Sequence, residues 1–119
     1  MTRDEMKRRT KDYANRIVKL CSVLQDGWIA QTLGKQLLRS GTSVGANYRA
    51  VCRAKSNADF INKLRVVEEE CDESLFWMEL LAENKLIGAA RLTNLMQEGN
   101  EILAIIVSSA KTARTSKTA

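Results

Sequence analysis

Apolar residues recur along this chain at steps of three and four positions, the spacing that places side chains on one face of an α-helix. The pattern breaks at residues 54–58, where we predict a turn. Ser56, followed three positions later by Asp59, matches a helix N-cap. We therefore expect a helix over about residues 57–83, with a buried face made of Phe60, Leu64, Val67, Cys71, Leu75 and Met78.

Three further helices follow from the same spacing. The pattern predicts a helix that begins by Thr10 and ends near Gln25, a second helix over about residues 29–54, and a last one over about residues 89–113. Asp26-Gly27 and Gly88 punctuate the connections, because glycine tolerates the backbone angles that end a helix. The inward positions are Tyr13, Ile17, Leu20, Cys21 and Leu24, then Ile29, Leu33, Leu37, Gly41, Val44, Tyr48 and Cys52, then Leu92, Leu95, Met96, Ile102, Leu103, Ile106 and Ala110.

Short connections between long helices favour an all-α fold, an antiparallel up-down-up-down four-helix bundle. The 119 residues fit a single domain spanning 1–119, with polar, basic termini at about 1–9 and 114–119. The chain has no proline to interrupt a helix. It also has more apolar residues than one such core needs, and we expect some of them to contact a neighbouring subunit. The surplus consists of Leu38, Val51, Ile61, Val66, Phe76, Trp77 and Leu80.

The predicted second helix is unusually rich in small residues, among them Gly34, Gly41 and Gly45. Each interior glycine costs a helix about 1 kcal/mol relative to alanine. We therefore expect a compensating role, either close approach of another helix or a local kink, and favour close packing. The segment lacks the G-x-x-x-x-G-K-[ST] pattern of a phosphate-binding loop.

Two other features have a structural and a functional interpretation. Trp28 is interpreted as an indole that plugs one end of the core, with ligand stacking as the alternative. The carboxylates of residues 68–73 indicate a solvated face, a metal site, or an ion-pair network with Arg39, Arg49 and Arg53. Ion pairing is favoured over metal, because bundle di-metal sites use Glu-x-x-His pairs and this chain contains no histidine.

The absence of histidine excludes Ser-His-Asp and Cys-His catalysis. Cys21, Cys52 and Cys71 lack the C-x-x-C spacing of zinc or redox sites and fit reduced, buried thiols. We therefore predict a protein that is not an enzyme, without catalytic, cofactor-binding or metal residues. No apolar run reaches the ~20 residues of a membrane helix, and the charged N-terminus does not resemble a signal peptide. These features predict no membrane partner and a cytoplasmic location.

Positive charge is concentrated at one end of the predicted bundle. Up-down topology places the N-terminus, the turn at residues 54–58 and the C-terminus together. That end collects thirteen of the nineteen Lys and Arg residues, and the whole chain carries a net charge of +5. We interpret it as a phosphate-binding surface for RNA or DNA, with basic tails kept for solubility as the alternative. The predicted nucleic-acid-binding residues are Arg3, Lys7, Arg8, Arg9, Arg53, Lys55 and Lys111.

Three segments carry a family resemblance: LLRSGTSVGANYRA, AKSNADFINKLR and ECDESLFWMELL. They resemble the four-helix-bundle proteins encoded by intervening sequences of bacterial 23S ribosomal RNA, often labelled S23 ribosomal protein. That family includes the accessory variability protein of diversity-generating retroelements. The resemblance covers roughly residues 13–107, and its most specific part runs from Ser40 to Asn47 and from Lys55 to Phe60.

The resemblance implies an up-down four-helix bundle and ring-shaped homopentamers with a basic surface that contacts nucleic acid or a reverse transcriptase. The family name records where such reading frames were found, and a gene's position is not a biochemical activity. Two hypotheses of different class therefore stand: a basic, oligomeric nucleic-acid-associated protein, or a scaffold whose partner is another protein. Gene neighbourhood separates them, since an adjacent reverse-transcriptase gene favours the accessory role.

Overall fold

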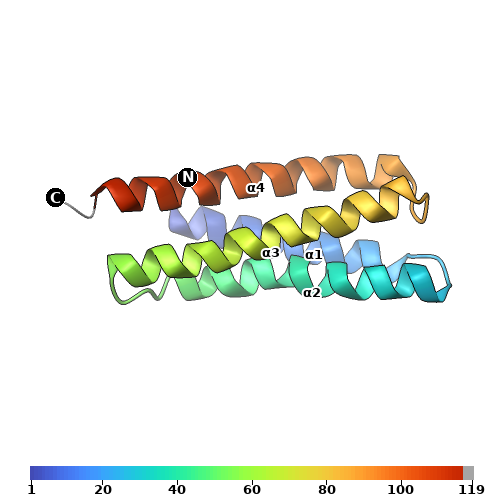
Figure 1. Cartoon of the computed structure of the whole chain (residues 1–119), viewed down its shortest axis with the longest axis horizontal. Coiled ribbons are helices and arrows are strands. Elements are labelled where there is room, and N and C mark those ends of the chain that lie inside the picture. The colour runs from blue at the N-terminus through green and yellow to red at the C-terminus, as the bar shows by residue number, and fades with distance from the viewer. Residues whose placement is uncertain (117–119) are drawn as a thin grey trace.

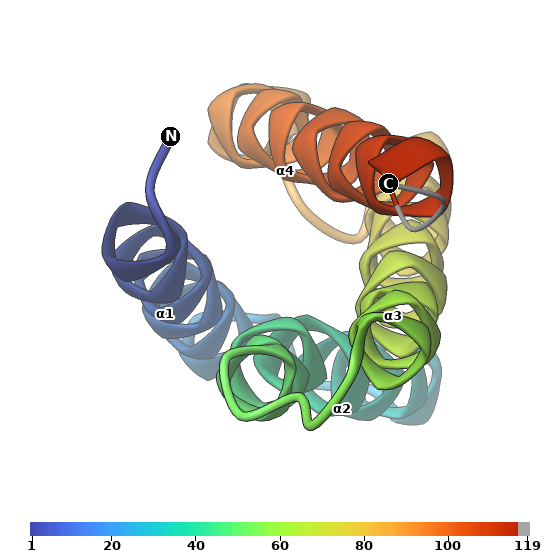
Figure 2. The same ribbon diagram turned by 90° about the vertical axis from the view of Figure 1, so that its left-hand side faces the viewer.

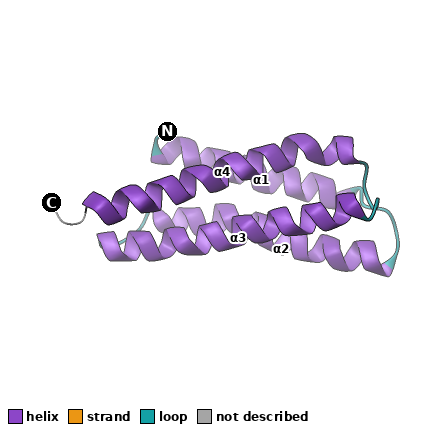
Figure 3. Cartoon of the chain, turned by 45° about the horizontal axis from the view of Figure 1, so that its top comes forward, coloured by secondary structure: helices purple, strands orange, loops and turns teal. Residues whose placement is uncertain are grey.

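Four antiparallel helices form the computed structural model, which describes residues 1–116 (Figure 1). Helix α1 spans Arg3–Ser22, α2 spans Trp28–Val51, α3 spans Asn57–Glu83 and α4 spans Ala89–Ser116. The described residues contain no strand. The bundle extends over 53 × 20 × 19 Å, and its short connections lie at the two ends (Figure 3). The predicted all-α, up-down-up-down four-helix bundle is confirmed.

The helices follow one another around the bundle axis in chain order, as the end-on view shows (Figure 2). α2 packs between α1 and α3, and α4 packs mainly on α3. α1 and α4 share the least extensive interface of the four neighbouring pairs. The core therefore depends mostly on the three consecutive hairpins, and the α1–α4 seam depends on a few specific contacts.

The helix ends differ from the predicted boundaries. α1 begins at Arg3 because Thr2 and Glu5 form a capping box, in which each side chain accepts a hydrogen bond of 3.1 Å from the other residue's backbone N–H. Most of the predicted polar terminus 1–9 is thus helical, and Met6 is buried. α1 ends three residues before the predicted Gln25, and α2 ends three before Ala54.

Two other predicted boundaries can be compared with the structure. Ser56 is confirmed as an N-cap, since its hydroxyl accepts from the Asp59 backbone N–H at 3.0 Å. The predicted C-terminal tail begins at residue 114, but α4 continues to Ser116. The rest of that tail, residues 117–119, lies outside the described residues.

The predicted inward face of α2 is correct at its centre and wrong at both ends. Ala30 and Val51 are buried there in place of Ile29, which is half exposed, and Cys52, which is only partly buried. The buried residues Ala30, Leu37, Val44 and Val51 repeat every seven positions, whereas the predicted stripe advances mostly by four, and each step of four turns about 40° beyond a full turn of the helix. Val51 and Ile61, which we expected outside the core, are buried.

Trp28 does not plug the core, because 78% of its surface is exposed. It is the first residue of α2, two positions before the buried Ala30. Two positions correspond to about 200° around a helix, so Trp28 points away from the core. The structural interpretation of this indole is therefore wrong.

Small residues let α1 and α2 approach closely. A Cβ atom at Gly41 would lie 2.8 Å from Cγ1 and 2.9 Å from Cγ2 of Ile17, and one at Gly45 would lie 3.1 Å from the carbonyl oxygen of Thr10. α2 continues without interruption through both glycines. The prediction of close helix packing is confirmed, and the packing compensates for the low helix propensity of glycine.

We expect Gly41→Ala to destabilise the fold although alanine is the better helix former. The branched Ile17 side chain is fully buried, so it cannot move aside cheaply, and overpacking costs about 1–3 kcal/mol. Gly88→Ala is the matched control, because nothing lies within 4 Å of its new Cβ and its φ is not positive. Urea denaturation should give a lower midpoint for Gly41→Ala alone. Equal midpoints for both variants would contradict the clash.

Candidate nucleic-acid interface

The bases near the N-terminus, the α2–α3 turn and the C-terminal part of α4 gather at one end of the bundle, as the topology predicted (Figure 1). The side chains of that end do not converge on one point. They divide into a groove over α1, α2 and the start of α3, and several bases that point elsewhere.

A hollow of about 570 Å³ lies between α1 and α2. Its floor consists of small residues, including Gly45 and Ala46, because the close helix contact at Gly45 brings the two backbones together. Basic side chains surround this floor, and Asp4 is the one acid in its lining. The bases are Lys7, Arg8 and Lys11 of α1 and Arg49 of α2.

A second hollow continues the first toward α3, since the two share Ala46 and Arg49. It adds Arg53 and Lys55 from the end of α2 and the turn, and Lys63 from α3. We call the combined surface the basic groove and define it by Lys7, Arg8, Lys11, Arg49, Arg53, Lys55 and Lys63.

Most charges of the basic groove are uncompensated. Among residues 1–116, Lys63 is the one groove base that forms an ion pair, at 2.6 Å from Asp59. Asp59 also accepts a hydrogen bond from the Lys55 backbone N–H at 3.0 Å. The hydrogen bond from Lys63, and to a smaller extent the one from Lys55, holds the pKa of the Asp59 carboxyl below its usual value. The other six bases are exposed. The groove therefore presents a concentrated positive potential to solvent.

The predicted site residues fall into three groups, and Arg3 and Arg9 form the last of them. Lys7, Arg8, Arg53 and Lys55 line the basic groove. Lys111 is exposed on α4 but lines neither hollow. The first four residues therefore lie on one surface, as predicted, and Lys111 lies apart from them.

Arg3 and Arg9 are engaged within the protein. The Arg3 guanidinium lies 5.1 Å from the centroid of the Phe60 ring. Arg9 donates to Glu98 and Glu101 of α4, each at 2.7 Å, and is half-buried. The hydrogen bonds to Glu98 contribute most to raising the pKa of the Arg9 guanidinium above its ordinary value. Arg9 thus ties α1 to α4 across the least extensive interface of the bundle, and a phosphate would have to displace two carboxylates to reach it.

Three groove bases were absent from the predicted site: Lys11, Arg49 and Lys63. The signal for two of them was the helix repeat, because Lys11 follows Lys7 by four positions and Arg49 precedes Arg53 by four. Residues at that spacing share a helix face. Lys63 lies four positions after Asp59, a spacing that instead indicates an ion pair.

Aromatic side chains are missing from the lining of the groove. Of the aromatic residues in this half, Tyr13 and Tyr48 are buried in the core, and Phe60 is partly buried beside the Arg3 guanidinium. Burial raises the pKa of Tyr48, and the Tyr13 hydroxyl lies 2.8 Å from the Ser74 hydroxyl oxygen. The groove therefore offers positive charge to phosphates but no aromatic ring on which a nucleobase could stack.

The acidic residues of α3 were predicted to form a solvated face, a metal site or an ion-pair network. Among the described residues, no group of three or more Cys, Asp or Glu side chains could hold a metal ion. Arg39 pairs with Glu70 at 3.1 Å and with Glu73, so the favoured ion-pair interpretation holds for Arg39. The predicted partners Arg49 and Arg53 form no ion pair within residues 1–116. No helix of this region is long and apolar enough to cross a bilayer.

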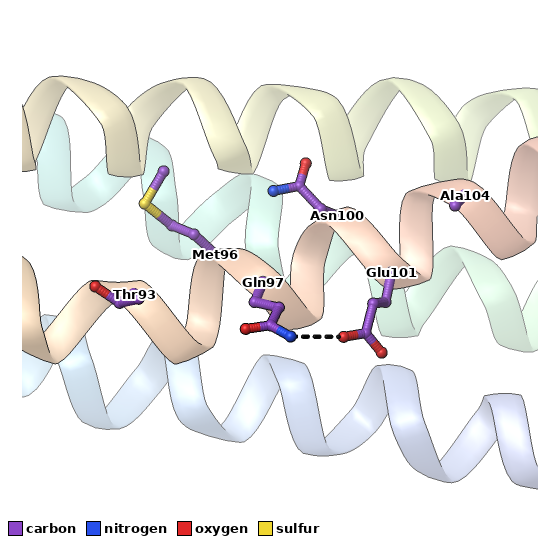
Figure 4. A pocket seen from close by; sticks show the side chains of 6 residues that line it. All are labelled: Thr93, Met96, Gln97, Asn100, Glu101 and Ala104. Atoms are coloured by element: carbon purple, nitrogen blue, oxygen red, sulfur yellow. Dashed lines mark hydrogen bonds between the residues drawn. The ribbon is translucent and has the colours of Figure 1, made fainter.

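Another hollow runs along α4 alone (Figure 4). In it Gln97 donates to Glu101 at 3.3 Å, and the other side chains are spread along the helix without converging. No basic side chain lines it, so it offers no second site for phosphate. The lining residues are Thr93, Met96, Gln97, Asn100, Glu101 and Ala104.

Comparison with known proteins gives a family and a structural relative. The family model described as 23S rRNA-intervening sequence protein matches residues 3–108. A crystal structure of a protein of unknown function from the S23 ribosomal protein family of Bacteroides thetaiotaomicron aligns with a TM-score of 0.86 and 36% sequence identity. The alignment covers 93% of this chain and 99% of that one. A search among curated proteins gives no match.

Proposed function

Because the chain belongs to the 23S rRNA-intervening sequence protein family, whose model matches residues 3–108, we propose that it is a non-enzymatic protein that associates with RNA or DNA in the cytoplasm. The observation that supports this proposal is the basic groove, with six exposed bases that form no ion pair within the described residues.

The proposed contact is with the phosphates of the nucleic acid rather than with its nucleobases. Lys and Arg side chains recognise phosphate by charge and hydrogen bonding, and neither depends on sequence. The floor of small residues lets a sugar-phosphate backbone approach α2 closely, between the cations of α1 and those of α2. The proposed binding is therefore independent of nucleotide sequence and open to both RNA and DNA.

Salt dependence tests the proposal. Displaced counterions make log K fall with log salt by about 0.9 per neutralised phosphate on duplex DNA and about 0.7 on a single strand. We expect a labelled unstructured RNA and a labelled duplex DNA to bind at low salt and to lose affinity steeply toward physiological salt. No binding at low salt would overturn the proposal and leave the protein-scaffold hypothesis ahead.

Self-association forms a second part of the proposal, supported by exposed apolar side chains such as Ile29 and Leu38. Pentamer is the assembly that the family resemblance implies, and a ring would multiply the phosphate contacts of one groove. Light scattering should give a mass several times that of the 13.3 kDa chain. A monomer mass at micromolar concentration would contradict it. A reverse transcriptase as protein partner is proposed on the same resemblance.

A further inference from the structure

The C-terminal two-thirds of α3 carries a surface opposite in charge to the basic groove. Residues 66–83 contain seven carboxylates and no Lys or Arg. In the midst of them Phe76 is 49% exposed. Positions three, four and seven away from Phe76 share its side of the helix. We call this surface the acidic–aromatic face and define it by Glu69, Asp72, Glu73, Phe76, Glu79, Leu80 and Glu83.

Contacts within residues 1–116 leave most of these charges unmatched. Glu73 pairs with Arg39, but Glu69, Asp72, Glu79 and Glu83 take part in no ion pair of the described region. Four uncompensated carboxylates along about 21 Å of helix create a negative potential around the exposed ring.

The exposed ring is held in place rather than free to fold back. Phe76 meets Trp77 edge to face, with ring centroids 5.1 Å apart. Trp77 packs partly against the core, and its indole N–H donates to the Glu73 carboxylate at 3.0 Å. A fixed ring loses little conformational entropy when a ligand covers it, a property of residues that anchor interfaces.

We propose that the acidic–aromatic face docks a cationic amphipathic segment of a partner protein. Such a segment carries an apolar stripe to cover Phe76 and Leu80, and Lys or Arg on both sides of it to meet the carboxylates. The charge complementarity excludes nucleic acid from this face, since phosphates would be repelled. This protein partner is additional to the nucleic acid of the proposed function, which would bind the basic groove on a different surface.

A second copy of this chain is the competing occupant, and its basic groove fits the face poorly. The groove supplies positive charge, but its apolar lining consists of small residues such as Ala14, Ala46 and Ala50. It has no large apolar side chain to cover the Phe76 ring. The acidic–aromatic face is therefore complementary to a surface that combines positive charge with large apolar side chains, as a cationic amphipathic helix does.

The test uses a labelled peptide of about four helical turns, built from Lys and Leu at helical spacing. We expect it to bind the wild-type protein at physiological salt, and a peptide with Ser in place of Leu to bind at least about tenfold more weakly. Phe76→Ala and the double variant Asp72→Asn, Glu79→Gln should each reduce the affinity about tenfold. Both variants alter exposed side chains, so helical circular dichroism should stay unchanged.

Two controls have matched chemistry elsewhere on the protein. Asp12→Asn with Asp26→Asn removes two exposed carboxylates from other surfaces, and Val107→Ala shortens an exposed apolar side chain on α4. Both should bind the peptide like the wild type. Equal weakening in the Asp12 and Asp26 control, or equal binding of the Ser peptide, would overturn the proposal. A fall in oligomer mass of Phe76→Ala with unchanged peptide affinity would also overturn it and assign the face to contacts between copies.

Discussion

Replacing Lys7, Arg8, Lys11 and Arg49 by glutamine is expected to reduce the affinity for RNA and DNA by about a hundredfold at low salt. These four bases surround one hollow, are exposed, and form no ion pair within the described residues. For each phosphate that the variant no longer neutralises, the log–log salt dependence should also become shallower by about 1. The titration against an unstructured RNA and a duplex DNA at several salt concentrations measures both quantities.

The matched control removes the same charge from the other half of the bundle. The control residues, Arg16, Lys19, Lys35 and Arg91, are exposed and lie toward the opposite end of the bundle. Because four cations are replaced by glutamine in each variant, the control and the groove variant have the same net charge. We expect the control to keep most of the affinity and the full slope. Equal reductions in the two variants would show that the basic groove has no special part in binding, and an unaffected groove variant would remove the groove from the mechanism.

Leu64→Ala is expected to lower the free energy of unfolding by about 2–5 kcal/mol. The Leu64 side chain is fully buried in the cluster shared by all four helices, and its truncation leaves a cavity that close packing cannot refill. Denaturant titration followed by circular dichroism measures the decrease, at one fixed protein concentration because the proposed self-association would add to the stability.

Val66→Ala is the control for Leu64→Ala, since Val66 is two positions away on the same helix and 42% exposed. A substitution at such a surface position usually changes stability by less than about 0.5 kcal/mol. If both variants unfold at the wild-type midpoint, the assignment of the inward face of α3 is wrong. If both are equally destabilised, Val66 is covered by another subunit.

Stability and the proposed function share one structural cause in α2. Gly41 and Gly45 allow α1 to lie close, and that approach places Lys7 and Lys11 beside Arg49. A larger residue at position 45 would press on the Thr10 carbonyl and separate the two rows of cations. The small-residue segment that carries the family resemblance thus also shapes the groove.

The sequence by itself determined the four helices, the central part of each inward face, the Ser56 cap and the gathering of bases at one end. These features depend on local periodicity, capping and topology, which act over a few residues or over whole helices. It also contained the Thr2–Glu5 capping box and the repeat that joins Lys7 to Lys11, although neither entered the predictions.

Only the tertiary structure decided which bases act together. Arg8 and Arg9 are neighbours in sequence, yet Arg8 lines the groove and Arg9 binds Glu98 and Glu101 on α4. One position turns a side chain by about 100° around the helix, so partner choice depends on how each helix is rotated and shifted against the next. Glycine contacts such as Gly41 against Ile17 set that rotation, and they join residues far apart in the chain.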